Sequence, residues 1–278
     1  MTGRRRPTGT GSLSRYEPEI ALPGGLANRG HVVRVGETVR RPQRRTSPAA
    51  HALLRHLEAV GFEGAPRFLG VDARGREVLT YIPGATVVPP YPDWALTDEA
   101  LVSVARLLRD YHRAVASFDA TPYVWPLSPP EPFAGELVSH NDLNLDNVVF
   151  RDNRAVALID FDLASPGSRL WDVACAARLW APVRPDSSIH DSRRGRTFER
   201  LRLFIDSYGV DDADRHRMAA AIPENQQWFG RLIARYVAAG HTAFTEYSRS
   251  AARLEAERYR RWLADSEPEL RHALAPLR

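Results

Sequence analysis

The chain has 278 residues, of which 44% are hydrophobic and 26% charged, and its formal net charge is +4. This composition is typical of a globular protein with a buried core, and it excludes disorder as the general state of the chain. No run of 18 apolar residues occurs, and the basic first residues are not followed by the apolar stretch of a secretory signal. The single cysteine, Cys175, excludes a disulfide framework and a cysteine-based zinc site. We therefore expect a cytoplasmic protein with no membrane partner.

All 38 basic residues are arginine, and the chain contains no lysine. This excludes the lysine of a Walker-A phosphate loop, a Schiff-base lysine and a serine–lysine catalytic pair. A nucleic-acid-binding protein would concentrate its basic residues among exposed aromatic side chains. Local clusters occur at residues 4–6 and 40–45, but arginines are found along the whole chain. We therefore expect no nucleic-acid partner.

The N-terminal third predicts a flexible tail and then a small β-rich lobe. Residues 1–19 are largely Gly, Ser, Thr and Arg, as is typical of a flexible tail. A glycine-punctuated loop at 22–30 precedes two β-branched segments that a turn at Gly36 and Glu37 joins into a hairpin. Ser47 and Pro48 then begin a helix. Strands are expected at 31–35, 38–41, 67–71 and 77–82. Residues 20–83 would form this lobe.

Residues 84–278 predict a second, larger and mainly helical lobe. A proline-rich connection at 85–94 precedes Thr97, which with two acidic residues after it is typical of a helix start. A strand pair is expected at 147–150 and 156–159. Further helices are expected at 171–180, 197–208, 212–220 and 226–263. The predicted fold class is therefore α+β, with a small β-sheet lobe that carries one helix and a larger α-helical lobe.

Three oxygen-bearing side chains stand directly beside apolar segments of the larger lobe. Asp142 and Asn147 lie in the segment 137–150, and Asp160 follows the apolar run Ala-Leu-Ile. A buried carboxylate costs several kcal/mol unless it is paired or binds a cation. Carboxylate and amide oxygens without a thiolate suit Mg²⁺, which completes its coordination with phosphate and water. This pattern predicts a magnesium site.

The order and spacing of these residues resemble a known family. The pattern His140-x-Asp142-x4-Asn147, followed by Ile-Asp160-Phe-Asp162, is similar to the aminoglycoside phosphotransferase family, which has a protein-kinase-like fold of two lobes. The segments Ser-Pro-Gly at 165–167 and Trp-Asp-Val-Ala at 171–174 also match. The resemblance covers roughly residues 20–265, and the order, spacing and apolar flanks make it specific.

The resemblance assigns the catalytic roles. Asp142 would accept the proton of a substrate hydroxyl and direct the hydroxyl oxygen toward the γ-phosphate of ATP or GTP. Asn147 and Asp160 would hold Mg²⁺. His140 and Asp172 would support the catalytic loop, and Asp172 would also stabilise the start of its own helix.

The resemblance also assigns nucleotide contacts to the small lobe. Arg40 would take the place of the phosphate-binding lysine, and Gly24, Gly25 and Gly30 would lie over the nucleotide. Backbone groups of Thr80–Ile82 would form the hinge that reads the base. The alternatives are a surface salt bridge for Arg40 and a simple hairpin for the glycine loop.

Two features depart from the family pattern. Arginine replaces the lysine, and it is longer and planar, so its phosphate geometry differs. The acidic residue expected in the following helix is missing, since Ala49, Ala50 and His51 stand there and Glu58 lies too late. The sequence therefore does not identify the partner of Arg40. Asp146 and Asp162 are additional carboxylates that would either tune the metal site or cap turns.

These observations favour a small-molecule O-phosphotransferase that depends on magnesium and uses ATP or GTP. An antibiotic, as in self-resistance, is a candidate acceptor. Polycationic acceptors call for an acidic cleft, whereas the larger lobe carries arginine runs at 193–196 and 258–261. We therefore expect a neutral or anionic acceptor. The alternatives are a catalytically silent nucleotide-binding interaction protein and a basic nucleic-acid-binding protein.

Overall fold

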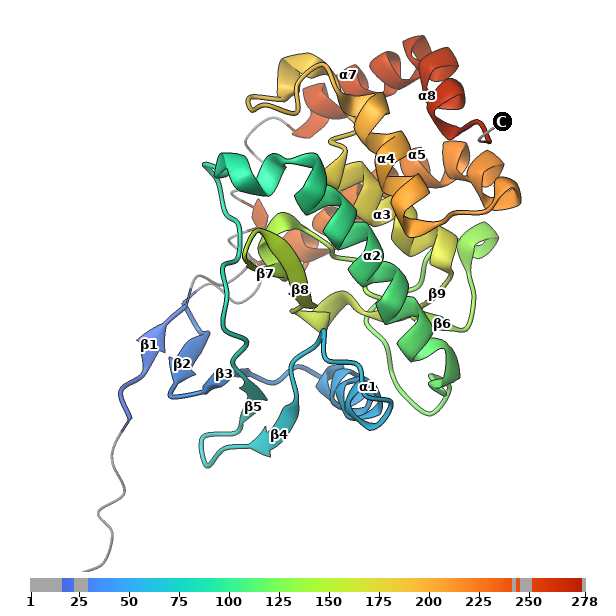
Figure 1. Cartoon of the computed structure of the whole chain (residues 1–278). Coiled ribbons are helices and arrows are strands. Elements are labelled where there is room, and N and C mark those ends of the chain that lie inside the picture. Colours follow the sequence, from blue (N-terminus) through green and yellow to red (C-terminus); the bar gives the residue numbers. More distant parts are fainter. Residues whose placement is uncertain (1–16, 23–29, 242–243, 246–251, 277–278) are drawn as a thin grey trace, which may run out of the picture.

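A computed structural model describes residues 17–22, 30–241, 244–245 and 252–276 of the chain. The small lobe is a five-stranded antiparallel sheet with one helix, α1 (Ser47–Ala59), which contacts strand β4 (Phe68–Val71) (Figure 1). The strands, in the spatial order β1-β2-β3-β5-β4, are β1 (Ile20–Ala21), β2 (Val33–Val35), β3 (Thr38–Pro42), β4 (Phe68–Val71) and β5 (Arg76–Thr80). The expected tail at 1–16 and loop residues 23–29, with Gly24 and Gly25, lie outside the described residues.

Local sequence signals explain the small lobe. Gly36 has φ +55°, a left-handed conformation that suits glycine in the tight turn between β2 and β3. The side chain of Asp72 accepts hydrogen bonds from the backbone N–H groups of Arg74 and Arg76, which closes the turn between β4 and β5. Helix α1 has a proline in its first turn and buries Leu53 and Leu57. The predicted hairpins and helix are confirmed.

The larger lobe is mainly helical, as predicted (Figure 1). Its described helices are α2 (Asp98–Ala114), α3 (Arg169–Trp180), α4 (Thr197–Tyr208), α5 (Asp212–Ala238), α7 (Ala252–Asp265) and α8 (Glu267–Leu274). Two short antiparallel strand pairs accompany them: β7 (Val148–Arg151) with β8 (Arg154–Leu158), and β6 (Leu137–Ser139) with β9 (Ser165–Gly167). None of the described helices is both long enough and apolar enough to cross a membrane.

Helix α5 corrects one prediction. Separate helices were expected at 212–220 and 226–263, but the structure has one continuous helix over 212–238 with Pro223 inside it. Proline disfavours a helix interior because it lacks an N–H group. Here the buried residues Ile222 and Trp228, on either side of Pro223, hold the helix together through packing. The helix ends at Ala238, and Gly240, which follows shortly after, has the φ of +82° that is typical of the residue after a helix C-terminus.

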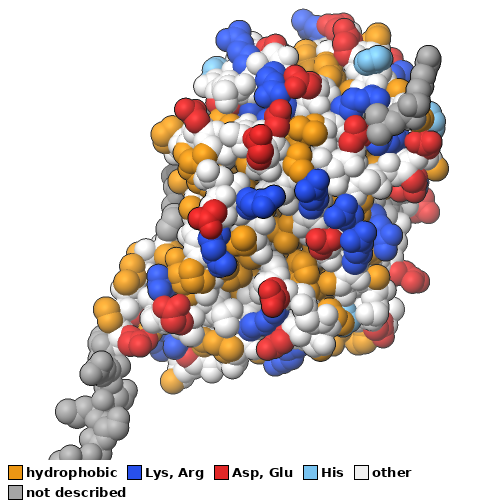
Figure 2. Space-filling model, viewed as in Figure 1, with side chains coloured by type: hydrophobic (Ala, Val, Ile, Leu, Met, Phe, Trp, Pro, Cys, Tyr) orange, Lys and Arg blue, Asp and Glu red, His pale blue; other side chains and the backbone are white. Residues whose placement is uncertain are grey.

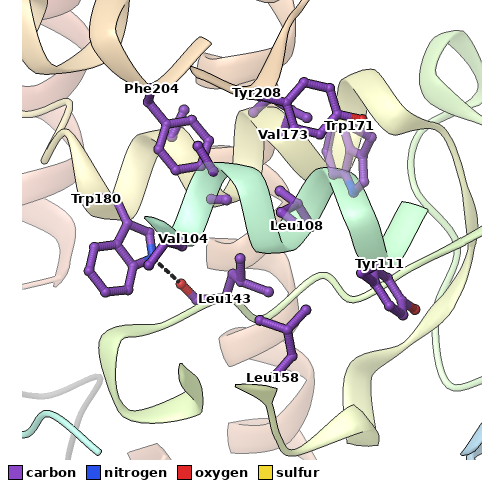
Figure 3. Close-up of a cluster of buried hydrophobic side chains, with 14 of the residues drawn as sticks. Val104, Leu108, Tyr111, Leu143, Leu158, Trp171, Val173, Trp180, Phe204 and Tyr208 are labelled. Atoms are coloured by element: carbon purple, nitrogen blue, oxygen red, sulfur yellow. Dashed lines mark hydrogen bonds between the residues drawn. The ribbon is translucent and has the colours of Figure 1, made fainter. Parts of the chain in front are cut away.

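The core of the larger lobe supports the segment that carries the candidate site. Val104, Leu108 and Tyr111 of α2 pack with Trp171 and Trp180 of α3 (Figure 3). The indole N–H of Trp180 donates to the carbonyl of Leu143 at 3.0 Å, which ties residues 140–147, the predicted catalytic segment, to this core. On the face shown in Figure 2, arginine and acidic side chains are interleaved over the larger lobe.

Candidate active site

The structure brings Asn147 and Asp160 to the wall of a cavity between the lobes, and Asp142 lies directly beside Asn147. The amide N–H of Asn147 donates to the carboxylate of Asp142 at 3.1 Å and to its carbonyl at 2.8 Å. The carbonyl of Asn147 accepts from the N–H of Ile159, next to Asp160. The cavity has a volume of about 200 Å³, and Asn147 and Asp160 line it together with Asp146. The three residues predicted from the sequence are thus neighbours in space.

Asp142 is half-buried and lies near other acidic groups. Burial raises its pKa to about 8, and the charges of Asp160 and Asp146 act in the same direction. Its two carboxylate oxygens accept hydrogen bonds from the side-chain amides of Asn144 at 2.5 Å and Asn147 at 3.1 Å. The site therefore holds more negative charge than its own side chains neutralise, as expected of a cation site.

In the absence of a divalent cation, Asp142→Asn is expected to stabilise the protein as the pH rises. The pKa of this carboxyl is higher in the folded state, about 8, than its ordinary value of 3.8. Folding therefore takes up a proton, and the wild-type protein loses stability as the pH rises between these two values. Above pH 8 the variant should gain more than about 1.4 kcal/mol, the equivalent of one pKa unit. Melting in EDTA at a series of pH values measures this, and a pH-independent difference would contradict it.

Asp160 stands in a strained backbone conformation and is paired to an arginine. Its φ of +62° is left-handed, which is uncommon for a residue other than glycine and typical of functional sites. One carboxylate oxygen lies 2.8 Å from a terminal nitrogen of Arg41. Burial acts to raise the pKa of Asp160, but the charge and hydrogen bond of Arg41 hold it below its ordinary value. Asp160 is therefore an anion in this arrangement.

The catalytic segment is held from behind by Asp172. Its two carboxylate oxygens accept hydrogen bonds from the backbone N–H groups of His140 at 2.7 Å and Asn141 at 2.9 Å. The ring of His112 lies 3.0 Å from the same carboxylate and 2.7 Å from the hydroxyl of Tyr208. All of these groups are buried. Asp172 thus lies where a loop-supporting residue is expected.

His140 also has the position of a supporting residue. Its Nε2 lies 3.1 Å from the carbonyl of Ile159, and its ring packs against Phe161 with 4.7 Å between centroids. Burial lowers its pKa, which favours the neutral ring. These contacts link the catalytic segment to the segment of Asp160.

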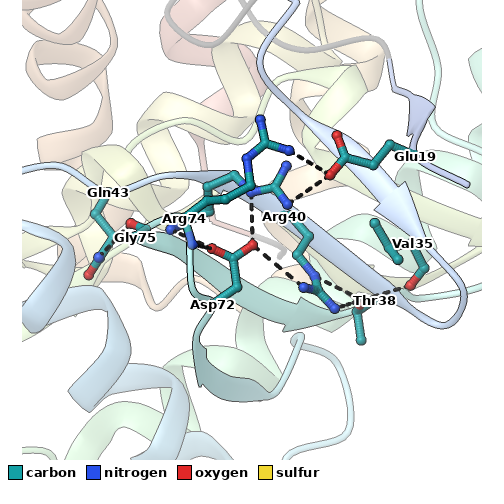
Figure 4. Close-up of polar contacts among 9 residues, drawn as sticks. Glu19, Val35, Thr38, Arg40, Gln43, Asp72, Arg74 and Gly75 are labelled. Atoms are coloured by element: carbon teal, nitrogen blue, oxygen red, sulfur yellow. Dashed lines mark hydrogen bonds and ion pairs between the residues drawn. The ribbon is translucent and has the colours of Figure 1, made fainter. Parts of the chain in front are cut away.

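Arg40 does not reach the site, which corrects the sequence prediction. Its guanidinium lies 3.5 Å from the carboxylate of Asp72 and 3.4 Å from the hydroxyl of Thr38 (Figure 4). The reason is the alternation of side chains along a strand. Val39 lines the cavity, so Arg41 lies on the same face of β3 and Arg40 lies on the other. The apolar side chain of Val39 could have predicted which face of β3 lies toward the cavity.

Arg41 lies at the site in place of Arg40. It lines the cavity, is 7% exposed, and contacts three carboxylates. Its Nε donates to Glu77 at 2.5 Å, and its terminal nitrogens lie 2.8 Å from Asp160 and 2.8 Å from Asp162. Glu77 comes from β5, where it is the direct cross-strand partner of Arg41. Strand β5 therefore supplies the acidic partner of the phosphate-binding side chain, which the family pattern places in the helix after β3.

The remaining predicted nucleotide contacts lie around the cavity in part. Thr80 and Ile82 line it, together with the apolar side chains of Val32, Val39 and Val149. Gly30 has φ +78° in a turn just before β2, and it is not among the residues that line the cavity. The structure therefore joins a hinge-like segment, an apolar chamber and an acidic wall in one cavity.

This combination defines a two-lobed, kinase-like protein, and comparisons with known proteins agree. A family model described as the phosphotransferase enzyme family (APH) matches residues 124–220, which include Asp142, Asn147 and Asp160. The trifolitoxin immunity protein of Rhizobium leguminosarum bv. trifolii is 34% identical over 214 residues, covering 71% of this chain and 76% of that protein. The chain therefore belongs to the phosphotransferase enzyme family.

Solved structures confirm the predicted fold. A choline/ethanolamine kinase family protein from Mesorhizobium loti has a TM-score of 0.61 at 16% identity, covering 94% of both chains. Aminoglycoside 2'-phosphotransferase-IIIa in complex with GDP has a TM-score of 0.56 at 13% identity, covering 94% of both chains. Macrolide 2'-phosphotransferase from Brachybacterium faecium has a TM-score of 0.51 at 15% identity, covering 94% of this chain and 92% of that one.

Proposed function

We propose that this phosphotransferase moves the γ-phosphoryl group of ATP or GTP to a hydroxyl group of a small molecule. One observation carries the proposal: Asn147 and Asp160 line the same cavity as Thr80 and Ile82, and the side chain of Asn147 is hydrogen-bonded to the carboxylate of Asp142. Structural relatives described as complexes with GDP and with ATP support a nucleoside triphosphate as donor.

The residues have distinct roles in this reaction. The Asp142 carboxylate accepts the proton of the acceptor hydroxyl as its oxygen attacks the γ-phosphorus, and the bond to the β-phosphate oxygen breaks. Arg41 offers its terminal N–H groups to the phosphate oxygens, a geometry that arginine matches bidentately. His140 and Asp172 hold the segment that carries Asp142.

The donor set at the site suits Mg²⁺ shared with a nucleotide. Among the described residues, no group of three or more His, Cys, Asp or Glu side chains is arranged to hold a metal ion alone. Magnesium, however, is usually bound by one or two protein carboxylates together with substrate phosphates. Asp160 and the amide oxygen of Asn147 would hold it, and Asp146 lies beside them. When bound, Mg²⁺ neutralises the charge that develops on the phosphates.

A catalytically silent nucleotide-binding protein is the alternative. Two departures from the family pattern suggest it: an arginine replaces the phosphate-binding lysine, and the helix that follows has no acidic residue at the expected position. The pairing of Arg41 with Glu77 favours the active protein, because it supplies both a phosphate-binding cation and a buried acidic partner at the site.

Arg178 favours a neutral or anionic acceptor. This residue of α3 donates to the amide oxygens of Asn225 at 3.0 Å and Gln226 at 2.7 Å, and it lies over the ring of Phe229. In the described part of the chain it forms no ion pair, so its positive charge is held without being neutralised. That charge acts on Asp142 to lower its pKa. We propose that the acceptor lies beside Arg178, where a cationic group of the acceptor would be repelled.

A matched acceptor screen tests the proposed function. Hydroxylated antibiotics that are neutral or anionic, and aminoglycosides such as kanamycin, are incubated with ATP or GTP and Mg²⁺, and phosphorylated product is followed by mass spectrometry. We expect product from neutral or anionic compounds, and a loss of at least about tenfold in acceptor kcat/KM for Arg178→Gln, with nucleotide KM unchanged. Faster phosphorylation of aminoglycosides would overturn the acceptor class. Absence of nucleotide binding in the wild-type protein would overturn the proposed function.

A further inference from the structure

We infer that His51 and Glu77 are positioning residues that orient Arg41 toward the triphosphate. The inference rests on the proposed function, and it assigns to three side chains from three elements the task that the family pattern gives to a lysine and a helix acid. His51 comes from α1, Glu77 from β5 and Arg41 from β3.

The contacts form one continuous chain. One carboxylate oxygen of Glu77 accepts from Nε of Arg41 at 2.5 Å, and the other lies 2.5 Å from Nε2 of His51. The three residues are buried, with exposures of 2% for Glu77, 5% for His51 and 7% for Arg41. Charge-assisted hydrogen bonds in such surroundings are strong, and they leave the carboxylate little freedom to turn.

The planar guanidinium explains why the acid comes from a strand. Its N–H groups form a rigid fork, so fixing Nε also fixes the direction of both terminal nitrogens. Nε of Arg41 faces its cross-strand partner Glu77, and the terminal nitrogens face Asp160 and Asp162 at the cavity. A lysine ammonium instead carries three rotatable donors on a single nitrogen, with no fixed fork. An arginine at this place is therefore best anchored sideways, within the sheet.

His51 connects this anchor to helix α1. Its ring stacks on the ring of Phe68 in β4, with centroids 3.7 Å apart and planes at 18°. The guanidinium of Arg55, also from α1, lies over the Phe68 ring. The stacking restricts rotation of the imidazole, so the position of α1 determines where Nε2 meets Glu77. The helix thus acts on the phosphate-binding group through His51, although it carries no acidic residue in that turn.

Two substitutions of His51 separate hydrogen bonding from packing. His51→Gln keeps an N–H donor near the position of Nε2 and loses the stacked ring, whereas His51→Phe keeps the ring and loses the donor. We expect His51→Phe to weaken ATP binding, or to lower the rate of ATP hydrolysis, by about tenfold or more. His51→Gln should stay within about threefold of the wild type. Arg40→Ala, on the other face of β3, is the matched control and should change neither quantity by more than about twofold.

Binding of ATP with Mg²⁺ by titration calorimetry, ATP hydrolysis kinetics and thermal melting give the readouts. A purely structural role of His51 predicts the reverse order, with His51→Gln the more harmful variant, and that result would overturn the inference. Equal nucleotide binding and hydrolysis by His51→Phe and the wild type would overturn it as well. Failure of the wild-type protein to bind any nucleoside triphosphate would instead overturn the proposed function. Glu77→Gln gives an independent check, because loss of its charge should weaken ATP binding at least as much as His51→Phe.

Discussion

Replacing Asp142 with alanine is expected to lower phosphoryl transfer by about 10²- to 10⁴-fold, the usual contribution of a general base. The carboxylate of Asp142 accepts hydrogen bonds from the side-chain amides of Asn144 and Asn147. Nucleotide affinity should change by no more than a few fold, because the phosphates are assigned to other groups. Product formation under saturating ATP and acceptor measures the effect.

The control for Asp142→Ala separates chemistry from folding. Since the charge of Asp142 is unfavourable without a cation, as its raised pKa indicates, its removal should not lower the melting temperature. A large loss of transfer with an unchanged or higher melting temperature therefore locates the effect in the reaction. Wild-type transfer by the variant would contradict the role of Asp142 as base, whereas nucleotide binding without any transfer by the wild-type protein would favour the catalytically silent alternative.

Local sequence patterns predicted the parts of this molecule that depend on neighbours in the chain. The helix expected at 197–208 has those bounds in the structure, and the metal and base candidates meet as their spacing suggested. Asp172 was expected to support the catalytic segment, and its carboxylate contacts the backbone there. In each case the signal is a short motif with its apolar flanks.

Features that depend on pairing between distant segments could not be predicted in the same way. Glu77 is 36 residues from Arg41, and only the register of β3 with β5 brings the two together. Strands β6 and β9 have three residues each, too few to show a periodic pattern. Separate helices were expected at 212–220 and 226–263, but the packing of α5 on α3 outweighs the local preference of Pro223 against a helix interior.

Asp172→Ala is expected to destabilise the folded protein by about 3–5 kcal/mol, as is typical when one partner of a buried polar network is removed. Three groups would lose their acceptor: the backbone N–H groups of His140 and Asn141 and the ring of His112. All lie in the interior, where water cannot replace the carboxylate without opening the structure. Urea unfolding at neutral pH measures the change.

The pH dependence of the more conservative Asp172→Asn distinguishes the charge from the shape of this side chain. Burial acts to raise the pKa of Asp172, but the hydrogen bond and charge of His112 hold it below the ordinary value of 3.8. A carboxyl with a lowered folded pKa stabilises the protein above its unfolded pKa and loses that contribution as the pH falls through the folded value. The difference in unfolding free energy between the wild type and Asp172→Asn should therefore be largest at neutral pH and shrink below about pH 4.

The matched control is Asp110→Asn. Asp110 is an exposed residue of α2 that is paired with Arg113, and its substitution should cost less than about 0.5 kcal/mol of stability. If Asp172→Ala costs no more than this control, the carboxylate does not hold the catalytic segment, and the support assigned to it must come from the surrounding apolar packing alone.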